Sequence, residues 1–361
     1  MRSLYRSLFL DDMPLLDVRA PAEFIKGAFP LATNLPLLND DERRRVGSAY
    51  KQLGQQAAVE LGHRLVSGSA KEERLAAWQV WHEEHPRGWL YCFRGGLRSQ
   101  IVQQWLAAVG VQIARVPGGY KALRHYLLET MEETCAIQRF VVVAGPTGSG
   151  KTALLNKLAA SADLEGLAGH RGSAFGSQLS GQPAQIDFEN ALALRFLKLS
   201  LLGAGVWYLE DESKAIGSLS LPHPLYDSMR QAPLALIRAP LEARTNTILN
   251  DYICENLREF QRLDPELGFV QFSQYLLGSL ARIQRRLGGD RYQEVVGDMQ
   301  EALRVQSHSG STEAHAMWIV KLLQHYYDPM YAYQLSKRQA VTVFEGSPDE
   351  FLAWAQMPAT A

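Results

Sequence analysis

Two short segments of the chain carry residues that can do chemistry on phosphate or sulfur groups. The first, residues 145–152, reads GPTGSGKT and matches the phosphate-binding pattern G-x-x-x-x-G-K-[ST]. In this pattern the glycines let backbone N–H groups converge on phosphate oxygens, the lysine adds a positive charge, and the final hydroxyl can ligate a metal ion. We therefore expect a di- or triphosphate to bind at Gly145, Gly148, Gly150, Lys151 and Thr152.

Two further segments are candidates for completing this phosphate site. An apolar run ends just before Asp211, with Glu210 and Glu212 beside it, and carboxylates at such a place often organise a metal ion or a water. Arg171 lies in a glycine-rich basic stretch that could close over an anion. The alternatives are a solvated acidic turn and an ordinary surface loop. We expect no metal site built by the protein and no tightly bound cofactor, although Mg²⁺ carried with the phosphates is compatible with the pattern.

The second chemical segment also follows an apolar run and precedes a helical pattern. Cys92 is followed by two glycines and by Arg94 and Arg98. Such a loop can turn its N–H groups toward the sulfur, and the arginines and the helix N-terminus would favour the thiolate. A thiolate held in this way can attack sulfur, selenium or phosphorus and carry the group covalently. Cys135 and Cys254 lack such surroundings and are expected to be structural.

Strand and helix patterns alternate along the chain and place both loops directly after strands. Apolar runs predict strands at 15–18, 89–92, 113–116, 140–144, 206–209 and 234–237. Amphipathic stretches predict helices at 55–66, 71–85, 100–109, 121–133 and from Lys151, and the chain beyond about residue 241 has a helical pattern. This alternation predicts an α/β protein with parallel sheets. A polar patch before the fourth strand places a boundary near residue 136, giving domains 1–136 and 137–361.

Composition limits the classes of protein to consider. The 361 residues are 47% hydrophobic and 21% charged, which is typical of a globular chain of two domains. Lys plus Arg number 37 against 38 acids, so a nucleic acid would have to bind a local basic surface. The three widely spaced cysteines include no Cys-x-x-Cys pair, which argues against a zinc ribbon or a disulfide framework. No apolar run approaches the ~18 residues of a membrane span. We therefore expect a cytoplasmic protein with no membrane partner.

Segments upstream of Cys92 favour one interpretation of its spacing to Arg98. That spacing, Cys-x5-Arg, also fits a phosphatase signature. However, Asp17-Val18-Arg19, Glu23-Phe24 and residues 27–34 (GAFPLATN) resemble the rhodanese family, whose segments read D-[VA]-R, E-[FY] and G-x-x-P-x-A-x-N. The resemblance covers approximately residues 12–130. It implies a rhodanese-like parallel-sheet domain that carries a transferable group on Cys92. The cysteine loop is one residue longer than in many rhodanese domains, which leaves room for a larger oxyanion.

The whole chain resembles the bacterial tRNA 2-selenouridine synthase family. A rhodanese-like domain is followed by a P-loop NTPase-like α/β domain with a helical C-terminal part, and matching segments occur at 39–51, 61–63, 170–176, 182–190 and 327–335. The resemblance implies a transferase that acts on the wobble 2-thiouridine of tRNA. The sulfur is first alkylated with a geranyl group from geranyl diphosphate. The S-geranyl group is then replaced by selenium from selenophosphate, and either a Cys92 perselenide or bound selenophosphate delivers the selenium.

The same resemblance assigns roles to the two loops. Arg94, Arg98 and the loop amides would hold the phosphate part of selenophosphate beside Cys92. Residues 145–154 are also similar to the loop of tRNA dimethylallyltransferases, which use a prenyl diphosphate. This similarity implies that Lys151 and Thr152 hold the diphosphate of the geranyl donor.

The residues by themselves leave other functions open. These are an ATP-dependent tRNA sulfurtransferase with a Cys92 persulfide, a Cys-x5-Arg phosphatase, and a non-catalytic adaptor that senses phosphate ligands.

Candidate contacts to tRNA are three basic clusters: Arg43-Arg44-Arg45, Arg282 with Arg285-Arg286, and Lys337-Arg338 beside Tyr331 and Tyr333. A solvated helix face is the alternative for each cluster.

Overall fold

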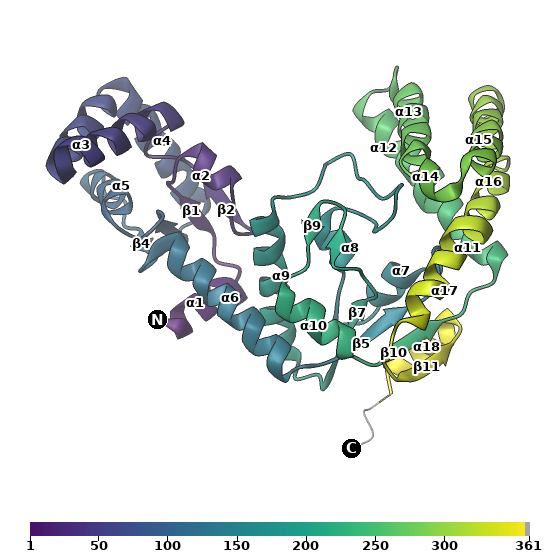
Figure 1. The fold of residues 1–361 in the computed structure, drawn as a ribbon. Helices are drawn as coiled ribbons and strands as arrows, with labels where there is room; N and C mark the ends of the chain where they lie inside the picture. The colour runs from purple at the N-terminus through teal and green to yellow at the C-terminus, as the bar shows by residue number, and fades with distance from the viewer. Residues whose placement is uncertain (358–361) are drawn as a thin grey trace. The chain divides into compact units, whose positions relative to one another are not determined.

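A computed structural model describes residues 1–357 and divides into two compact units (Figure 1). Unit 1 comprises Met1–Thr134 and Ala184–Leu201, and unit 2 comprises Cys135–Pro183 and the chain from Leu202 onward. The single boundary expected near residue 136 did not anticipate that helix α9 (Gln185–Leu199) lies with unit 1. The fully buried Asn190 on this helix accepts a hydrogen bond from Arg124 (2.8 Å) and donates one to the Ala28 carbonyl (2.6 Å).

Unit 1 is built on a four-stranded parallel sheet with the strand order β2-β1-β3-β4. The strands are β1 (Leu15–Asp17), β2 (Ala32–Asn34), β3 (Trp89–Tyr91) and β4 (Ala114–Arg115). The other helices of this unit are α1 (Arg2–Leu10), α2 (Pro21–Ile25), α3 (Asp40–Leu65), α4 (Ser69–Glu84), α5 (Leu97–Ala108) and α6 (Gly119–Ile137), whose last residues belong to unit 2, and a short 3₁₀ turn follows α9 at Ser200–Leu202. Parallel sheets are covered on both faces, and Leu16, Trp78, Leu90 and Leu106 form part of one core.

A buried ion pair lies at the end of β1, in one of the segments that resemble rhodaneses. The side chains of Asp17 and Arg19 are 0% and 2% exposed, and Arg19 Nη2 lies 2.6 Å from Asp17 Oδ2. Arg19 also donates to the Gly27 carbonyl (2.8 Å), and its guanidinium carbon lies 3.7 Å from the centre of the Tyr120 ring. Asn34 donates to the carbonyls of Asp17 and Arg19. These motif residues therefore hold the strand ends together.

We expect Arg19→Leu to be strongly destabilising. Removing one partner of a buried pair leaves an uncompensated charge, and such changes cost about 3–5 kcal/mol of folding free energy. Denaturant unfolding would measure the loss. Arg2→Leu is a suitable control, because the Arg2 side chain is 54% exposed and a surface ion pair such as Arg2–Glu133 contributes little to stability. A wild-type midpoint for Arg19→Leu would contradict this account of the pair.

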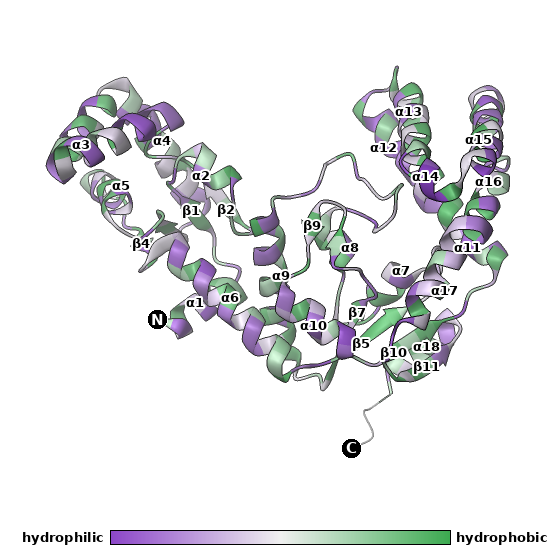
Figure 2. Ribbon diagram, in the orientation of Figure 1, coloured by the Kyte–Doolittle hydropathy of each residue, from purple (hydrophilic) through white to green (hydrophobic). Residues whose placement is uncertain are grey.

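Unit 2 contains a five-stranded parallel sheet with the order β11-β10-β5-β7-β6. The strands are β5 (Arg139–Ala144), β6 (Ser161–Ala162), β7 (Val206–Glu210), β10 (Leu234–Ile237) and β11 (Thr342–Gly346), and a separate antiparallel pair is formed by β8 (Ala215–Ile216) and β9 (Leu219–Ser220). The central strand β5 is buried from Phe140 to Ala144 and is coloured as hydrophobic in Figure 2. All six strands expected from apolar runs are confirmed, with small shifts at their ends. Five of the described strands, all short or at a sheet edge, were not predicted: β2, β6, β8, β9 and β11.

Helices cover this sheet and form a separate core of their own. They are α7 (Lys151–Leu155), α8 (Leu164–Ala168), α10 (His223–Gln231), α11 (Leu241–Ile248), α12 (Glu255–Leu263), α13 (Gly268–Ala281), α14 (Gln284–Leu287), α15 (Gly289–Ser309), α16 (His315–Leu322), α17 (Asp328–Ser336) and α18 (Pro348–Ala355). Two π-helical segments, Leu249–Cys254 and Leu323–Tyr327, interrupt the helical part. Across residues 1–357, no helix combines the length and the apolar character needed to cross a membrane.

Candidate active sites

The predicted phosphate-binding loop joins β5 to α7. Gly148 and Gly150 have φ values of +83° and +75°, which side chains other than glycine rarely adopt. A Cβ atom at Gly148 would also lie 2.7 Å from the Arg244 carbonyl oxygen, so this position needs glycine for space as well. All five residues expected to bind phosphate line one cavity of about 610 Å³: Gly145, Gly148, Gly150, Lys151 and Thr152.

An arginine that was not predicted as a site residue stabilises this loop with a hydrogen bond. Arg244, on α11, is 6% exposed and donates from Nε to the Thr147 carbonyl oxygen (2.9 Å). Its guanidinium also forms an ion pair with Asp328, the first residue of α17 (Nη2–Oδ1, 2.5 Å). The loop conformation is therefore coupled to the helical part of unit 2.

Several carboxylates lie close to the threonine of the loop, and Glu165 and Glu212 among them line the cavity. Thr152 Oγ1 donates to Glu210 Oε1 (2.6 Å), and the Glu165 backbone N–H donates to Glu210 Oε2 (3.1 Å). Burial, together with the charges of Glu165 and Asp163, raises the pKa of Glu210 from 4.5 to about 8. Burial and Glu165 also raise the pKa of Glu212 well above its ordinary value. A raised pKa reduces the negative charge that these carboxyls carry, which would lower their repulsion of a phosphate ligand.

Glu210 should make the stability of the ligand-free protein depend on pH. The folded chain keeps this proton up to about pH 8, whereas an unfolded chain releases it near pH 4.5, so the folded state binds more protons between these values. The contribution of Glu210 to stability therefore falls as pH rises through this window. Glu210→Gln should show a smaller fall in Tm between pH 5 and pH 8 than wild type. The exposed Glu242→Gln is the control, and equal pH slopes for all three proteins would contradict the assignment.

The two other predicted residues of this site also line the cavity but are already engaged by protein groups. Asp211 forms an ion pair with Arg338. The guanidinium of Arg171 donates to the Asp251 carbonyl and lies 5.1 Å from the centre of the Tyr252 ring. Thr152 therefore contacts Glu210, the last residue of β7, rather than Asp211, and its hydroxyl also lies 3.4 Å from Glu165 Oε2.

An apolar slot adjoins the cavity of about 610 Å³ lined by the predicted phosphate-binding loop, which we call the phosphate cavity. Its lining includes Trp318, Leu322 and Leu323, and it shares five residues with the cavity: Thr147, Ser173, Ile248, Tyr252 and Tyr327. Both tyrosines lie in the π-helical segments, and burial raises the pKa of each hydroxyl above its ordinary value. The slot has a volume of about 30 Å³ in this structure. The unit 2 site thus places a narrow, uncharged apolar wall beside a phosphate-binding loop.

The cysteine loop of unit 1 is held by the first residues of α6. Cys92 is 3% exposed, and its Sγ lies 3.3 Å from Ser99 Oγ and 3.8 Å from the Gly96 carbonyl oxygen. The backbone N–H of Tyr120 donates to the Cys92 carbonyl (2.9 Å). A Cβ atom at Gly119 would lie 2.2 Å from that same oxygen, which explains why a glycine must start α6.

The two arginines of the cysteine loop have different surroundings. Arg98 is held by Glu23, with Nη1 donating to Oε2 (2.6 Å), and Arg43 also contacts that carboxylate (2.9 Å). Burial opposes ionisation of Glu23, but the hydrogen bond and charge of Arg98 outweigh it and keep the pKa of Glu23 below its ordinary value. Arg94 is exposed, lies 5.9 Å from the centre of the Phe93 ring, and forms no ion pair within residues 1–357. Arg94 is therefore the arginine of this loop that remains available to an anion.

The basic clusters expected to contact tRNA differ in exposure. Arg44, Arg285 and Arg286 are exposed. Lys337 is also exposed, with its ammonium 4.1 Å from the centre of the Tyr333 ring. By contrast, the side chain of Arg338 is only 5% exposed because it pairs with Asp211. Arg338 is therefore paired with a residue of the cavity wall and does not contribute to a basic surface.

Comparison with known proteins places the chain in a family. A family model described as "tRNA 2-selenouridine synthase AAA domain" matches residues 138–361. Relatives named tRNA 2-selenouridine synthase occur in Pseudomonas fluorescens Pf0-1, 52% identical over 95% of this chain and 94% of the relative, and in Bordetella bronchiseptica RB50, 52% identical over 99% and 98%. The N-terminal domain of a putative ATP/GTP binding protein from Clostridium difficile 630 is 31% identical and covers 34% of this chain and 95% of its own, with a TM-score of 0.30, which is too low to compare the folds. The chain belongs to the tRNA 2-selenouridine synthase family, enzymes named for making 2-selenouridine in tRNA.

Proposed function

We propose that this protein converts the wobble 2-thiouridine of tRNA to 2-selenouridine through an S-geranyl intermediate, with one step in each unit. In the first step the thiocarbonyl sulfur attacks C1 of geranyl diphosphate. A sulfur–carbon bond forms, the carbon–oxygen bond to diphosphate breaks, and the base loses its N3 proton. The products are S-geranyl-2-thiouridine and diphosphate.

The second step takes place at the cysteine loop and needs no change of oxidation state. The Cys92 thiolate attacks the phosphorus of selenophosphate, so that a sulfur–phosphorus bond forms and hydrogen selenide anion leaves. Selenide then attacks C2 of the modified uridine, and geranylthiolate leaves and takes up a proton. Water cleaves the phosphocysteine and releases phosphate. A Cys92 perselenide would instead require a separate redox partner, and we therefore favour attack on phosphorus.

The observation that carries the first step is the apolar slot beside the phosphate loop. A prenyl diphosphate has an apolar chain attached directly to a diphosphate, and Ile248 and Tyr327 line both the slot and the phosphate cavity. A ten-carbon chain must widen the narrow slot when it binds. Lys151 and the loop amides would hold the diphosphate, with Arg171 and Asp211 also lining the cavity.

Oxygen groups beside the loop also fit a divalent cation. The Thr152 hydroxyl and the Glu210 carboxyl lie within 2.6 Å of each other, and hydroxyl and carboxylate oxygens are ligands that Mg²⁺ prefers. A bound Mg²⁺ would neutralise charge on the diphosphate. It would also favour the ionised form of Glu210.

The surroundings of Arg98 favour this second step over a Cys-x5-Arg phosphatase. A phosphatase of that kind needs its arginine to bind the phosphate directly. Here the Arg98 guanidinium is bound by Glu23, and Arg94 is the exposed cation of the loop. We assign Arg94 and the loop amides to the phosphate of selenophosphate, and Arg98 to positioning the first turn of α5.

Calorimetric binding tests the assignment of the prenyl donor. Geranyl diphosphate should bind at least about 100-fold more tightly than inorganic diphosphate, because buried CH₂ groups contribute ~0.8 kcal/mol each. Ile248→Thr should lower the affinity for geranyl diphosphate about tenfold, because an apolar contact is lost. The affinity for inorganic diphosphate should not change. Leu263→Thr, on the exposed surface of α12, is the control. Tight binding of ATP with no preference for the prenyl compound would contradict the proposal.

A further inference from the structure

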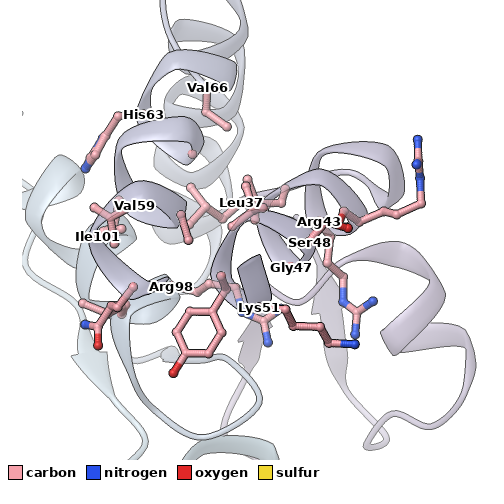
Figure 3. Close-up of a pocket in the computed structure, with 18 of the residues that line it drawn as sticks. Leu37, Arg43, Gly47, Ser48, Lys51, Val59, His63, Val66, Arg98 and Ile101 are labelled. Atoms are coloured by element: carbon pink, nitrogen blue, oxygen red, sulfur yellow. The ribbon is translucent and has the colours of Figure 1, made fainter. Parts of the chain in front are cut away.

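Unit 1 contains a large cavity of its own, which is lined by Arg98 of the cysteine loop but not by Cys92 (Figure 3). It has a volume of about 540 Å³ and lies between α3 and the start of α5. Ligand sites commonly occupy about 300–1,000 Å³, so this volume is large enough for a sizeable organic group. We refer to it as the α3–α5 cavity.

A break in α3 shapes the cavity. Gly54 has φ +88° and ψ −178°, so the helix changes direction there, and both halves contribute to the wall. A Cβ atom at Gly62 would lie 3.9 Å from Val46 Cγ2, which shows how closely the two halves approach each other. The second half carries Val59 toward the cavity, where Figure 3 shows it beside Leu37.

The wall of the cavity is apolar and its rim is positively charged. Apolar wall residues include Leu37, Val46, Val59, Val66, Ile101 and Trp105. Four cations also line it: Arg43, Arg44, Lys51 and Arg98. Among the described residues, no aspartate or glutamate lines the cavity. This combination fits an apolar group attached to an anionic one.

The first turn of α5 connects this cavity to the reactive thiol. Leu97, Arg98 and Ile101 line the cavity, while Ser99 on the same turn has its Oγ 3.3 Å from Cys92 Sγ. A ligand in the cavity would therefore lie against the turn that also holds the thiol. Arg98 on this wall is held by two hydrogen bonds to Glu23.

The rim is suited to separate phosphates more than to a diphosphate. Arg43 and Arg98 share the Glu23 carboxylate, and Arg44 pairs with Asp41, so their charges are already partly compensated. Lys51 is exposed and forms no ion pair within residues 1–357. A diphosphate requires several unpaired donors that converge on one point. Dispersed phosphates of an RNA backbone require only scattered cations near the surface.

We propose that the α3–α5 cavity binds the prenyl chain of an S-prenylated uridine in RNA. Lys51, Arg43 and Arg44 at the rim contact the flanking phosphates, and the modified base is thereby presented to the cysteine loop. The inference rests on the proposed function, because it takes S-geranyl-2-thiouridine as the substrate of the second step. It assigns unit 1 a means of distinguishing prenylated from unmodified tRNA.

Fluorescence anisotropy with two synthetic anticodon stem-loop RNAs tests this site in the full-length protein. One RNA carries S-geranyl-2-thiouridine at the wobble position and the other carries 2-thiouridine. Wild type should bind the geranylated RNA at least about tenfold more tightly, since the chain transfers several CH₂ groups from water. Val59→Trp, which fills the cavity, should abolish this preference. Leu53→Trp is the matched control, because Leu53 lies on the same helix, is 72% exposed and does not line the cavity.

A second variant keeps the test decisive if Val59→Trp does not fold. Lys51→Glu changes an exposed residue and should lower the affinity for both RNAs by a similar factor. The preference for the geranylated RNA should persist. Equal binding of the two RNAs by wild type would overturn the proposal. So would a loss of geranyl diphosphate binding in Val59→Trp, because the cavity would then be a donor site. The RNAs are made chemically, so failure of the protein to geranylate tRNA would contradict the proposed function without changing these results.

Discussion

Replacing Cys92 by alanine is expected to abolish selenium incorporation and leave geranylation intact. The thiolate is the only group in the proposed second step that opens the phosphorus–selenium bond. Removing a covalent nucleophile typically lowers turnover by about 10³-fold or more. The S-geranyl nucleoside should therefore accumulate when thiolated tRNA is incubated with Cys92→Ala, geranyl diphosphate and selenophosphate. Nucleoside mass spectrometry would measure both products.

Cys254→Ala provides the control for a general effect of removing a thiol. Cys254 lies in a π-helical segment of unit 2 and lines neither of the two large cavities. This variant should form 2-selenouridine at the wild-type rate. If Cys92→Ala made 2-selenouridine as fast as wild type, Cys92 would have no covalent role, and a direct attack by bound selenophosphate would have to replace the proposed step.

Replacing Lys151 by alanine is expected to have the opposite effect on the two steps. The lysine lies at the start of α7 and lines the phosphate cavity, where its charge would stabilise the departing diphosphate. Removing one preorganised electrostatic group of this kind costs about 10²–10³-fold in rate. Geranyl transfer from geranyl diphosphate to thiolated RNA should fall by that factor, as measured by the appearance of the S-geranyl nucleoside.

The neighbouring Lys157→Ala distinguishes a specific effect from a change in overall charge. Lys157 is exposed, is close in sequence and does not line the cavity. It should transfer geranyl groups at the wild-type rate. Equal rates for Lys151→Ala and wild type would mean that the loop does not hold the donor.

The sequence predicted the central strands of both sheets because parallel strands buried on two faces read as continuous apolar runs. The run 140–144 is an example, and it is buried along its length. Strands with few apolar residues gave no such signal. Ala32–Asn34 and Ser161–Ala162 are short, and Thr342–Gly346 lies at the sheet edge with residues that remain partly exposed.

The two loops could be located from local motifs, but their partners could not. Glycine spacing located the loop that contains Gly148 and Lys151, and both residues line one cavity in the structure. Thr152 contacts Glu210, which lies 58 residues away in the sequence. Arg244 donates a hydrogen bond to Thr147, which lies 97 residues away. Similarly, the spacing from Cys92 to Arg98 carries no information that Glu23 binds the arginine. Such pairings arise from tertiary folding, which single-sequence patterns do not encode.

The most direct test of the central claim, two steps at two separate sites, is to supply RNA that is already S-geranylated. Wild type, Lys151→Ala and Cys92→Ala would each be incubated with this RNA and selenophosphate, and 2-selenouridine would be measured by mass spectrometry. We expect Lys151→Ala to form 2-selenouridine within about twofold of the wild-type rate, because its defect precedes this substrate. Cys92→Ala should form almost none. Failure of Lys151→Ala on pre-geranylated RNA, or full activity of Cys92→Ala, would contradict the division of the reaction between the two loops.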